Sequence, residues 1–226
     1  MTNICLRAWN WCRRFRKRCG YGVHSPSDFF LITFVIYEKL PFYAYASLHK
    51  LRKEMKPFPH YREKVDRLLL RLVNHCRPAL LLEVGTGSGL HTNYMAAGNV
   101  NMDVMSSTDC CVEQVGRRLA ETSRISYGDI QLDEMKQVWK DMDTSKVMVH
   151  IGFTPNYRDV YEQFLPLAGE NTCFVIGTPY ADKDKKRWWK EVIADQRTGV
   201  TFDLYDIGLV FFDKKRVKEH RVVNFL

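Results

Sequence analysis

The sequence predicts a doubly wound, Rossmann-like α/β fold with a mainly parallel seven-stranded sheet, an antiparallel edge and an N-terminal helical appendage. After Pro78 the chain alternates five times between short apolar runs, typical of buried strands, and segments with helical periodicity. Beyond Asp195, three β-rich runs follow one another with no helix between them. Such runs are typical of an antiparallel edge on a doubly wound sheet.

The N-terminal part of the chain has the pattern of helices. Helices are expected over residues 28–39, 46–55 and 60–76. The last of these repeats apolar side chains at i, i+3 and i+4, as an amphipathic helix does. Pro57 and Pro59 interrupt the helical pattern before it. We therefore expect a helical appendage over residues 1–58 and an α/β domain over residues 59–226.

The α/β part begins with Ala79–Val84, an apolar run that predicts a central strand buried on both faces. Strands are expected over residues 79–84, 102–107, 125–127, 146–151 and 173–176, and β-rich runs over 200–205, 208–212 and 221–225. Helices are expected over residues 90–97, 110–122, 132–140, 156–167 and 183–195.

The composition is that of an ordinary globular protein. Of the 226 residues, 46% are hydrophobic and 27% are charged, which excludes collagen, coiled coils and disordered chains. No apolar run approaches the roughly 20 residues of a membrane-spanning helix. The N-terminus also lacks the order of a signal peptide. We expect a cytoplasmic protein without a transmembrane segment.

The seven cysteines include no C-x-x-C pair. Their spacing therefore suggests neither a disulfide framework nor a zinc site. Cys5, Cys12 and Cys19 recur every seven residues and would share one face of a helix. We interpret them as small apolar residues on a buried stripe, with a metal or redox role as the alternative.

The net charge of +8 is concentrated at the N-terminus. Residues 1–20 contain no acid and six basic residues: Arg7, Arg13, Arg14, Arg16, Lys17 and Arg18. Because Trp9, Trp11 and Phe15 are interleaved with them, the segment could contact nucleic acid, an anionic membrane surface or an acidic partner. The alternative, which the sequence favours, is a solvated basic helix packed through its aromatic side.

The sharpest local signal is a glycine-rich turn, Glu83-Val84-Gly85-Thr86-Gly87-Ser88-Gly89, between a predicted strand and a predicted helix. Glycines suit a turn that needs positive φ or that a ligand approaches closely. A dinucleotide fingerprint would need a third glycine where Leu90 stands, and no Gly-Lys-Ser/Thr follows as in a phosphate loop. The spacing argues against both of these motifs.

An acid followed by G-x-G-x-G resembles motif I of the class I S-adenosylmethionine-dependent methyltransferases. The chain is also similar to an O-methyltransferase-like group common in Bacteroidetes. The similar stretches are YGVHSP (21–26), PFYAY (41–45), RLLLRLVNHCRPALLLEVGTGSGLHT (67–92) and TFDLYDIGLVFFDKKRVKEH (201–220). The resemblance covers nearly all of the chain from Tyr21 and implies S-adenosyl-L-methionine as the cofactor.

The resemblance also implies a cofactor site. In the family the turn cradles the amino-acid and ribose portions of the cofactor, which assigns to it Glu83, Gly85, Thr86, Gly87 and Gly89. Asp109, after the second strand, is expected on the ribose hydroxyls, because a carboxylate can accept two hydrogen bonds from a vicinal diol. Asp129, after the third strand, is expected near the adenine. Either aspartate alone would more often be a helix cap. Gly152, after the fourth strand, completes the set.

The sequence departs from the group where metal-dependent relatives hold Mg²⁺. Gly152 and Pro155 stand where the group has an acid and a histidine, and Gly177-Thr178 stands where its fifth strand ends in two acids. A hard cation needs several oxygen ligands, so no metal is expected. Two histidines are candidate general bases. The alternative role for His150 is that of a buried, hydrogen-bonded core residue. The alternative role for His24 is that of a residue at the entry to a helix.

Three functions fit these observations. The favoured one is metal-free methyl transfer to an oxygen or nitrogen of a small-molecule acceptor, with the rate supplied by positioning. The second is a non-catalytic S-adenosylmethionine-binding protein. The third is a nucleic-acid methyltransferase that uses residues 1–20 as an electrostatic anchor. The sequence predicts neither the acceptor nor the oligomeric state.

Overall fold

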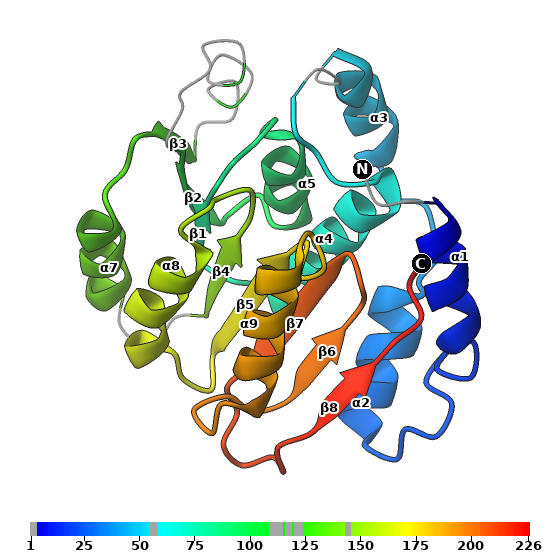
Figure 1. The fold of residues 1–226 in the computed structure, drawn as a ribbon. Helices are drawn as coiled ribbons and strands as arrows, with labels where there is room; N and C mark the ends of the chain where they lie inside the picture. Colours follow the sequence, from blue (N-terminus) through cyan, green and yellow to red (C-terminus); the bar gives the residue numbers. More distant parts are fainter. Residues whose placement is uncertain (1–3, 55–57, 109–114, 116–118, 120–123, 143–145) are drawn as a thin grey trace.

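A computed structural model describes residues 4–54, 58–108, 115, 119, 124–142 and 146–226. Its strands are β1 (Leu80–Val84), β2 (Asp103–Ser107), β3 (Ile125–Gly128), β4 (Val147–Ile151), β5 (Thr172–Gly177), β6 (Thr201–Asp203), β7 (Ile207–Phe211) and β8 (His220–Val222). They form one sheet in the order β3-β2-β1-β4-β5-β7-β6-β8, in which β7 is antiparallel to both of its neighbours (Figure 1). The doubly wound α/β prediction is confirmed. The expected count of seven strands is wrong, because the short β8 adds an eighth strand beside β6.

The helices lie close to their expected positions. They are α1 (Ile4–Arg13), α2 (Pro26–Phe30), the π-helix η1 (Leu31–Ile36), α3 (Tyr45–Glu54), α4 (Glu63–Cys76), α5 (Leu90–Gly98), α7 (Leu132–Asp141), α8 (Tyr157–Phe164), the 3₁₀ turn η2 (Leu165–Leu167) and α9 (Lys183–Ala194). Most of the helix expected over residues 110–122 lies outside the described residues.

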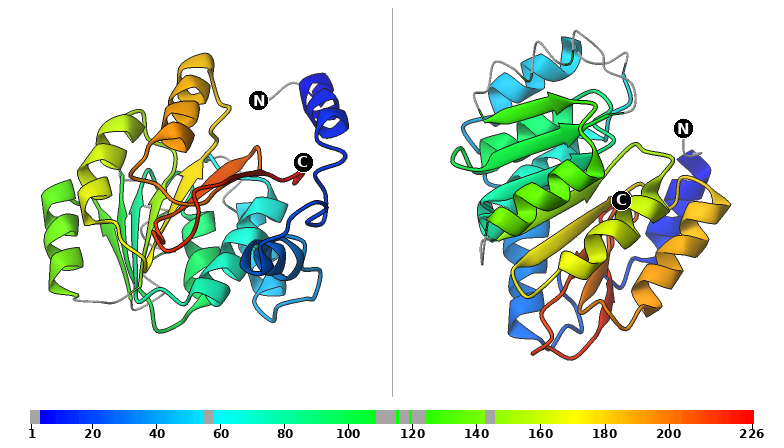
Figure 2. Two further views of the ribbon diagram at one scale, coloured as in Figure 1. Left: turned by 90° about the horizontal axis from the view of Figure 1, so that it is seen from below. Right: turned by 90° about the vertical axis from the view of Figure 1, so that its left-hand side faces the viewer.

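Helices cover both faces of the sheet (Figure 2). On one face, Leu81 of β1 belongs to the hydrophobic core that includes α4 and η1. On the other face, its neighbours Leu80 and Leu82 belong to the core that includes α8 and α9. Successive side chains of a strand point to opposite faces. A central strand between two helical layers must therefore be apolar at every position, as the run 79–84 nearly is.

The N-terminal helices share a core with the sheet. Ile32 and Ile36 of η1 are buried in the same cluster as Leu68 of α4 and Phe202 of β6. Asp28, at the start of α2, is 1% exposed and pairs with Arg216 and Arg221 from the C-terminal part of the chain. Residues 26–36 are thus held to the sheet by both apolar packing and ion pairs.

Helix α1 is attached to the sheet through arginines. Arg7 Nη1 lies 2.5 Å from Asp206 Oδ1, and Arg14 Nη1 lies 2.9 Å from Asp203 Oδ1. The aromatic side chains of this segment are exposed: Trp9, Trp11 and Phe15. The expectation of a helix packed through its aromatic side is therefore wrong. The two acids, at the end of β6 and just beyond it, instead attract the guanidinium groups.

Two expectations from the composition can be compared with the structure. Cys5, Cys12 and Cys19 are exposed, so the interpretation as a buried stripe is wrong. The side of α1 that faces the protein carries arginines where that stripe was expected. Among the described residues, no helix is long and apolar enough to cross a bilayer.

Candidate functional site

The glycine-rich turn lies where a doubly wound sheet binds its ligands. Strand β1 stands between β2 and β4, so the chain order reverses on either side of it. Ligands of such sheets bind in the crevice beyond the carboxyl ends of the strands at this reversal. The turn connects the carboxyl end of β1 to the start of α5. Its three glycines have positive φ: 87° at Gly85, 55° at Gly87 and 68° at Gly89, which L-residues with a side chain rarely adopt.

Protein atoms approach these glycines closely. A Cβ at Gly85 would lie 2.6 Å from the backbone nitrogen of Phe153, and one at Gly87 would lie 2.6 Å from Cδ2 of the Phe153 ring. The Ser88 N–H donates to the carbonyl oxygen of Pro59 at 2.8 Å. The turn is therefore held between Phe153, which follows β4, and the segment before α4. The need for glycine here follows from this packing, whether or not a ligand also approaches.

Gly152 has a similar packing role. Its N–H donates to the Val84 carbonyl at 2.8 Å, which continues the pairing of β4 with β1 beyond the strands. A Cβ at this position would lie 2.5 Å from the carbonyl oxygen of Gly85. The absence of a side chain at this position thus lets the end of β4 approach the turn. Its assignment as a cofactor contact stays a prediction.

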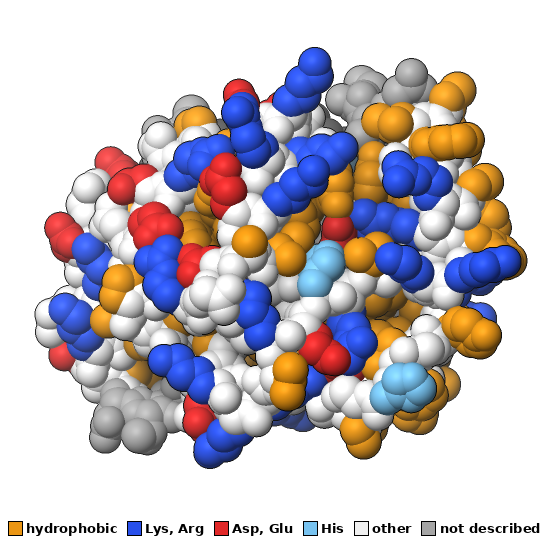
Figure 3. Space-filling view, turned by 60° about the horizontal axis from the view of Figure 1, so that its bottom comes forward, with side chains coloured by type: hydrophobic (Ala, Val, Ile, Leu, Met, Phe, Trp, Pro, Cys, Tyr) orange, Lys and Arg blue, Asp and Glu red, His pale blue; other side chains and the backbone are white. Residues whose placement is uncertain are grey.

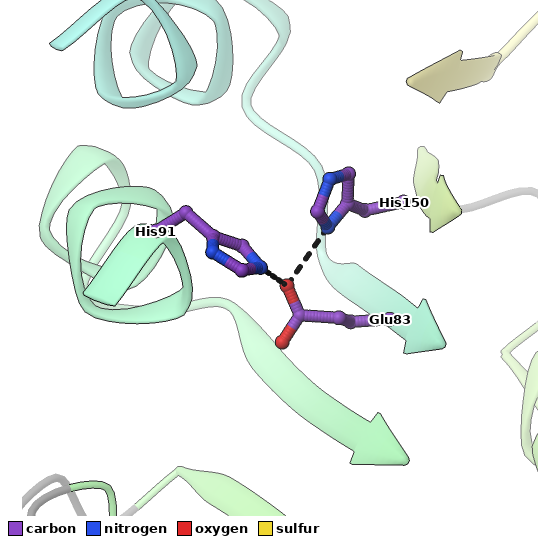
Figure 4. Close-up of side chains that lie close together, drawn as sticks. All are labelled: Glu83, His91 and His150. Atoms are coloured by element: carbon purple, nitrogen blue, oxygen red, sulfur yellow. Dashed lines mark hydrogen bonds and ion pairs between the residues drawn. The ribbon is translucent and has the colours of Figure 1, made fainter. Parts of the chain in front are cut away.

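Glu83 is the centre of a buried polar cluster (Figure 4). In the sheet it lies beside Ser106 of β2 and His150 of β4, so three neighbouring strands present polar side chains at one level. Its Oε1 accepts from His150 Nδ1 at 2.9 Å, and its Oε2 accepts from Ser106 Oγ at 2.5 Å and from Thr92 Oγ1 at 2.6 Å. His91 Nε2 lies 3.0 Å from Oε1. Glu83 is 0% exposed and both of its oxygens bind protein groups. It therefore supports the turn from inside the protein.

The protonation of the cluster follows from its contacts. Burial raises the pKa of Glu83, but the nearby His91 and the hydrogen bond from His150 outweigh it and hold the pKa well below its usual range. Burial lowers the pKa of His150, so its imidazole is neutral. Burial raises the pKa of Tyr61 well above normal, so its hydroxyl stays protonated. The Tyr61 hydroxyl then donates to His150 Nε2 at 3.0 Å, and the Nδ1–H of His150 donates to Glu83.

Three side chains of this cluster are of the types that bind metal ions. Glu83, His91 and His150 offer ligand atoms that all lie within 4.8 Å of one another. A structural zinc ion has four protein ligands, and a catalytic one keeps a position open to water or substrate. This cluster offers three ligands and, with every member fully buried, no solvent-facing position. Hydrogen bonds satisfy the polar atoms of Glu83 and His150, whereas neither ring nitrogen of His91 has a hydrogen-bond partner among the described residues. Because the cluster lacks both a fourth ligand and an open position, it does not have the composition of a zinc centre.

The structure corrects both candidate general bases. His150 is 0% exposed and both of its ring nitrogens bind protein groups, so it has no free nitrogen for an acceptor's proton. It positions Glu83 instead. His24 is exposed next to Ser25, which contacts Arg216 in the loop between β7 and β8. That loop leaves the antiparallel β7 at the amino edge of the parallel strands. His24 therefore lies at the edge opposite the turn.

The remaining predicted cofactor residues have mixed placements. Thr86 is buried, and its hydroxyl lies 2.6 Å from that of Ser106, which ties the turn to the Glu83 cluster. Asp129 is exposed after β3, where it accepts from Gln131 Nε2 at 3.2 Å. Asp109 lies outside the described residues. The contacts expected of Asp109 and Asp129 stay predictions.

A second polar cluster occupies the carboxyl edge next to β5. Asp203 Oδ1 accepts from Arg14 and from the Tyr205 N–H, and Asp203 Oδ2 accepts from Tyr180 Oη. The rings of Tyr180 and Tyr205 stack with centroids 5.0 Å apart. Tyr205 and Thr178 have positive φ although neither is glycine. Backbone strain of this kind is found most often at active sites and ligand-binding sites. Asp203 and Tyr205 belong to the stretch 201–220 singled out in the sequence, but Arg14 and Tyr180 are far from it in the chain, so their meeting was not predictable.

Neither a protein-family model nor a curated protein matches the chain in sequence. Solved structures do match its fold. The O-methyltransferase TomG from Streptomyces achromogenes, in complex with SAM, has a TM-score of 0.52 at 14% identity, covering 77% of this chain and 91% of that one. An O-methyltransferase from Bacillus cereus in complex with SAH has a TM-score of 0.52 at 16% identity over 76% and 92%. The SAH-bound methyltransferase PaMTH1 from Podospora anserina has a TM-score of 0.55 at 8% identity over 94% and 98%. The chain therefore has the fold of these methyltransferases.

Proposed function

We propose that the chain binds S-adenosylmethionine at Gly85–Gly89 and transfers its methyl group to an oxygen or nitrogen of a small-molecule acceptor. One observation carries the proposal. The G-x-G-x-G turn, with three glycines in the left-handed region, stands at the reversal point of the sheet. Three structures with this fold contain SAM or SAH. When bound, the cofactor supplies a methyl group that its sulfonium already activates.

The chain's own residues would act by positioning. The Glu83 cluster supports the turn from inside the protein, and Phe153 and Pro59 pack against its glycines. Orientation and exclusion of water can contribute as much as ~7–11 kcal/mol to such a reaction, so no covalent help from the protein is required. The bound cofactor would supply the methyl group to an oxygen or nitrogen of the acceptor, with its own sulfide as the leaving group, and the acceptor's proton would pass to solvent.

We further propose that the reaction needs no metal. Strand β4 is followed by Gly152, and β5 ends at Gly177, where the related group carries acids. Of the acids described at this edge, Asp203 and Asp206 are paired with Arg14 and Arg7. Mg²⁺ gives up its water reluctantly and is usually bound through carboxylates. Asp182, beyond β5, caps α9 by accepting from the Lys185 N–H at 2.8 Å. Neither β4 nor β5 itself ends in a carboxylate that could hold the ion.

The non-catalytic alternative is supported by a specific observation. The Phe153 ring lies against Gly87, and it stacks on Tyr61 with centroids 4.7 Å apart. The Ser88 N–H, which faces ligands in many glycine-rich turns, is bonded to Pro59. These contacts leave the cofactor less of the turn to bind.

Calorimetry with S-adenosylmethionine and S-adenosylhomocysteine tests the proposal, followed by turnover on a panel of small acceptors with and without EDTA. Binding of both ligands and metal-independent transfer to a member of the panel are expected. Failure of the folded protein to bind either ligand at about millimolar concentration would contradict the cofactor site. Tight binding without transfer to any acceptor would favour the non-catalytic alternative.

A further inference from the structure

The segment Ile4–Arg18 exposes an unusual combination of side chains. It is attached to the protein by Arg7 and Arg14 and by hydrogen bonds from Asn224 to its backbone. Its apolar side chains face outward: Ile4 is 81% exposed and Trp9 63%, and Leu6, Trp11 and Phe15 are also exposed. A soluble protein rarely leaves so many large apolar side chains of one helix uncovered.

The same segment carries free positive charge. Arg13, Arg16, Lys17 and Arg18 are exposed, and no acid occurs between residues 4 and 18. Arg18 lies 5.8 Å from the ring centroids of both Trp11 and Phe15, so basic and aromatic groups are interleaved on the surface. Figure 3 shows hydrophobic and basic side chains next to each other on the right-hand flank of the molecule, where α1 lies in Figure 1.

We propose that residues 4–18 are a docking surface for an anionic phospholipid bilayer. Interfacial helices combine basic residues, which the negative surface attracts, with Trp, Phe and Leu, which enter the boundary between headgroups and acyl chains. Charge complementarity selects an anionic partner, and the aliphatic Ile4 and Leu6 select a lipid over a nucleic acid. Phosphate backbones would use the four cations but offer these two side chains nothing to bury them.

The attachment of α1 fixes how the protein would sit on the bilayer. Arg7 and Arg14 bind acids that follow or end β6, at the carboxyl edge of the sheet. Docking through α1 would therefore bring that edge near the membrane surface. The inference does not depend on the proposed function, because it rests only on the exposed side chains of residues 4–18.

Vesicle flotation of the full chain tests the inference. Vesicles of phosphatidylcholine alone are compared with vesicles that also contain about 30 mol% phosphatidylglycerol, a content that gives a negative surface potential. Binding to the anionic vesicles is expected, with loss in about 0.5 M salt because the charges are then screened. Absence of binding to the anionic vesicles by the folded protein overturns the inference.

Two variants separate the charged from the apolar contribution. Replacing Arg13, Arg16, Lys17 and Arg18 by Gln should lower the partition coefficient at least about tenfold. Trp9→Ser with Phe15→Ser should lower it about tenfold without changing the net charge. The matched control replaces four exposed lysines elsewhere by Gln: Lys140, Lys183, Lys190 and Lys214. It should bind within about twofold of the wild type.

The outcomes are decisive because all of the replaced side chains are exposed, and thermal melting verifies that each variant folds. Equal loss of binding in the control variant would mean that only the net charge matters, and would overturn the assignment to residues 4–18. Salt-dependent binding of single-stranded RNA together with no binding to vesicles would overturn it in favour of a nucleic acid.

Discussion

Replacing Glu83 by Gln should destabilise the protein even without any ligand. The carboxylate accepts three hydrogen bonds, from His150, Ser106 and Thr92, and is fully buried. Gln has nearly the same shape, but it removes the charge and turns one acceptor into a donor. The two bonds that remain each lose about 1 kcal/mol with the charge, and at least one buried donor loses its acceptor at a cost of about 1–3 kcal/mol. The sum is about 3–5 kcal/mol.

Thermal and urea unfolding of the ligand-free protein measure this loss. For a chain of this size, 3–5 kcal/mol corresponds to a fall in Tm of about 6–20 °C. Glu170→Gln is the matched control, because Glu170 is exposed and pairs with Lys215 at the surface. Exposed pairs of this kind contribute about 0–1 kcal/mol, so its Tm should change little.

The pH dependence gives a second test of the same reasoning. The pKa of Glu83 is lower in the folded protein than its ordinary value of 4.5. A group with a depressed pKa contributes stability above the unfolded pKa and loses it as the pH falls toward the folded pKa. The difference in stability between wild type and Glu83→Gln should therefore be constant above about pH 5.5 and shrink below about pH 4.5. A ligand-free Glu83→Gln protein as stable as the wild type would refute the anchoring role and return Glu83 to the cofactor site.

Three further predictions concern the turn, a buried acid and the metal. Gly87→Ala should abolish or strongly weaken S-adenosylmethionine binding, because its Cβ would meet Phe153 and Pro59, whereas Gly169→Ala, with open space around its Cβ, should bind normally in the same titration. Burial raises the pKa of Asp66 to about 7 despite its pairing with Arg52. The stability that wild type has relative to Asp66→Asn should thus fall between about pH 4 and 7, by up to about 1.4 kcal/mol per pH unit in urea unfolding. Methyl transfer should survive EDTA, and activity that disappears with EDTA and returns with Mg²⁺ would contradict the metal-free proposal.

The positions of the elements were predictable from the sequence because their signals are local. The apolar run 79–84 and the helical repeat at 60–76 became β1 and α4 with shifts of a few residues at their ends. The β-rich run expected over residues 221–225 corresponds to the short strand β8, which pairs with β6. The run itself is visible in the sequence, but its partner strand and its register are not.

The errors in the candidate site come from contacts between distant parts of the chain. His24 was expected near the turn, but Asp28 binds Arg216 and Arg221, which holds this segment at the opposite edge. Helical periodicity shows that α1 has two faces, yet it does not show which face packs. That was decided by Asp203 and Asp206, almost two hundred residues away. Strand register, which the sequence does not reveal, placed His150 beside Glu83 and removed it from the candidate bases.

These placements have a consequence for the acceptor, if the proposed function holds. The described part of the carboxyl edge contains two polar clusters, one around Glu83 and one around Asp203, and their carboxylates are bound to protein groups. The histidines of the first cluster, His91 and His150, are fully buried, and Arg14 of the second is paired with Asp203, so neither cluster presents a basic side chain to a hydroxyl of high pKa. General base catalysis contributes typically 10²–10⁴-fold where it operates. Acceptors whose attacking atom needs no deprotonation, such as a neutral amine or an already ionised phenol, should therefore react fastest. Their rates should follow the ionisation of the acceptor with pH, and a rate that instead follows a group of the protein near pH 6–7 would point to a base in the residues that the structure does not describe.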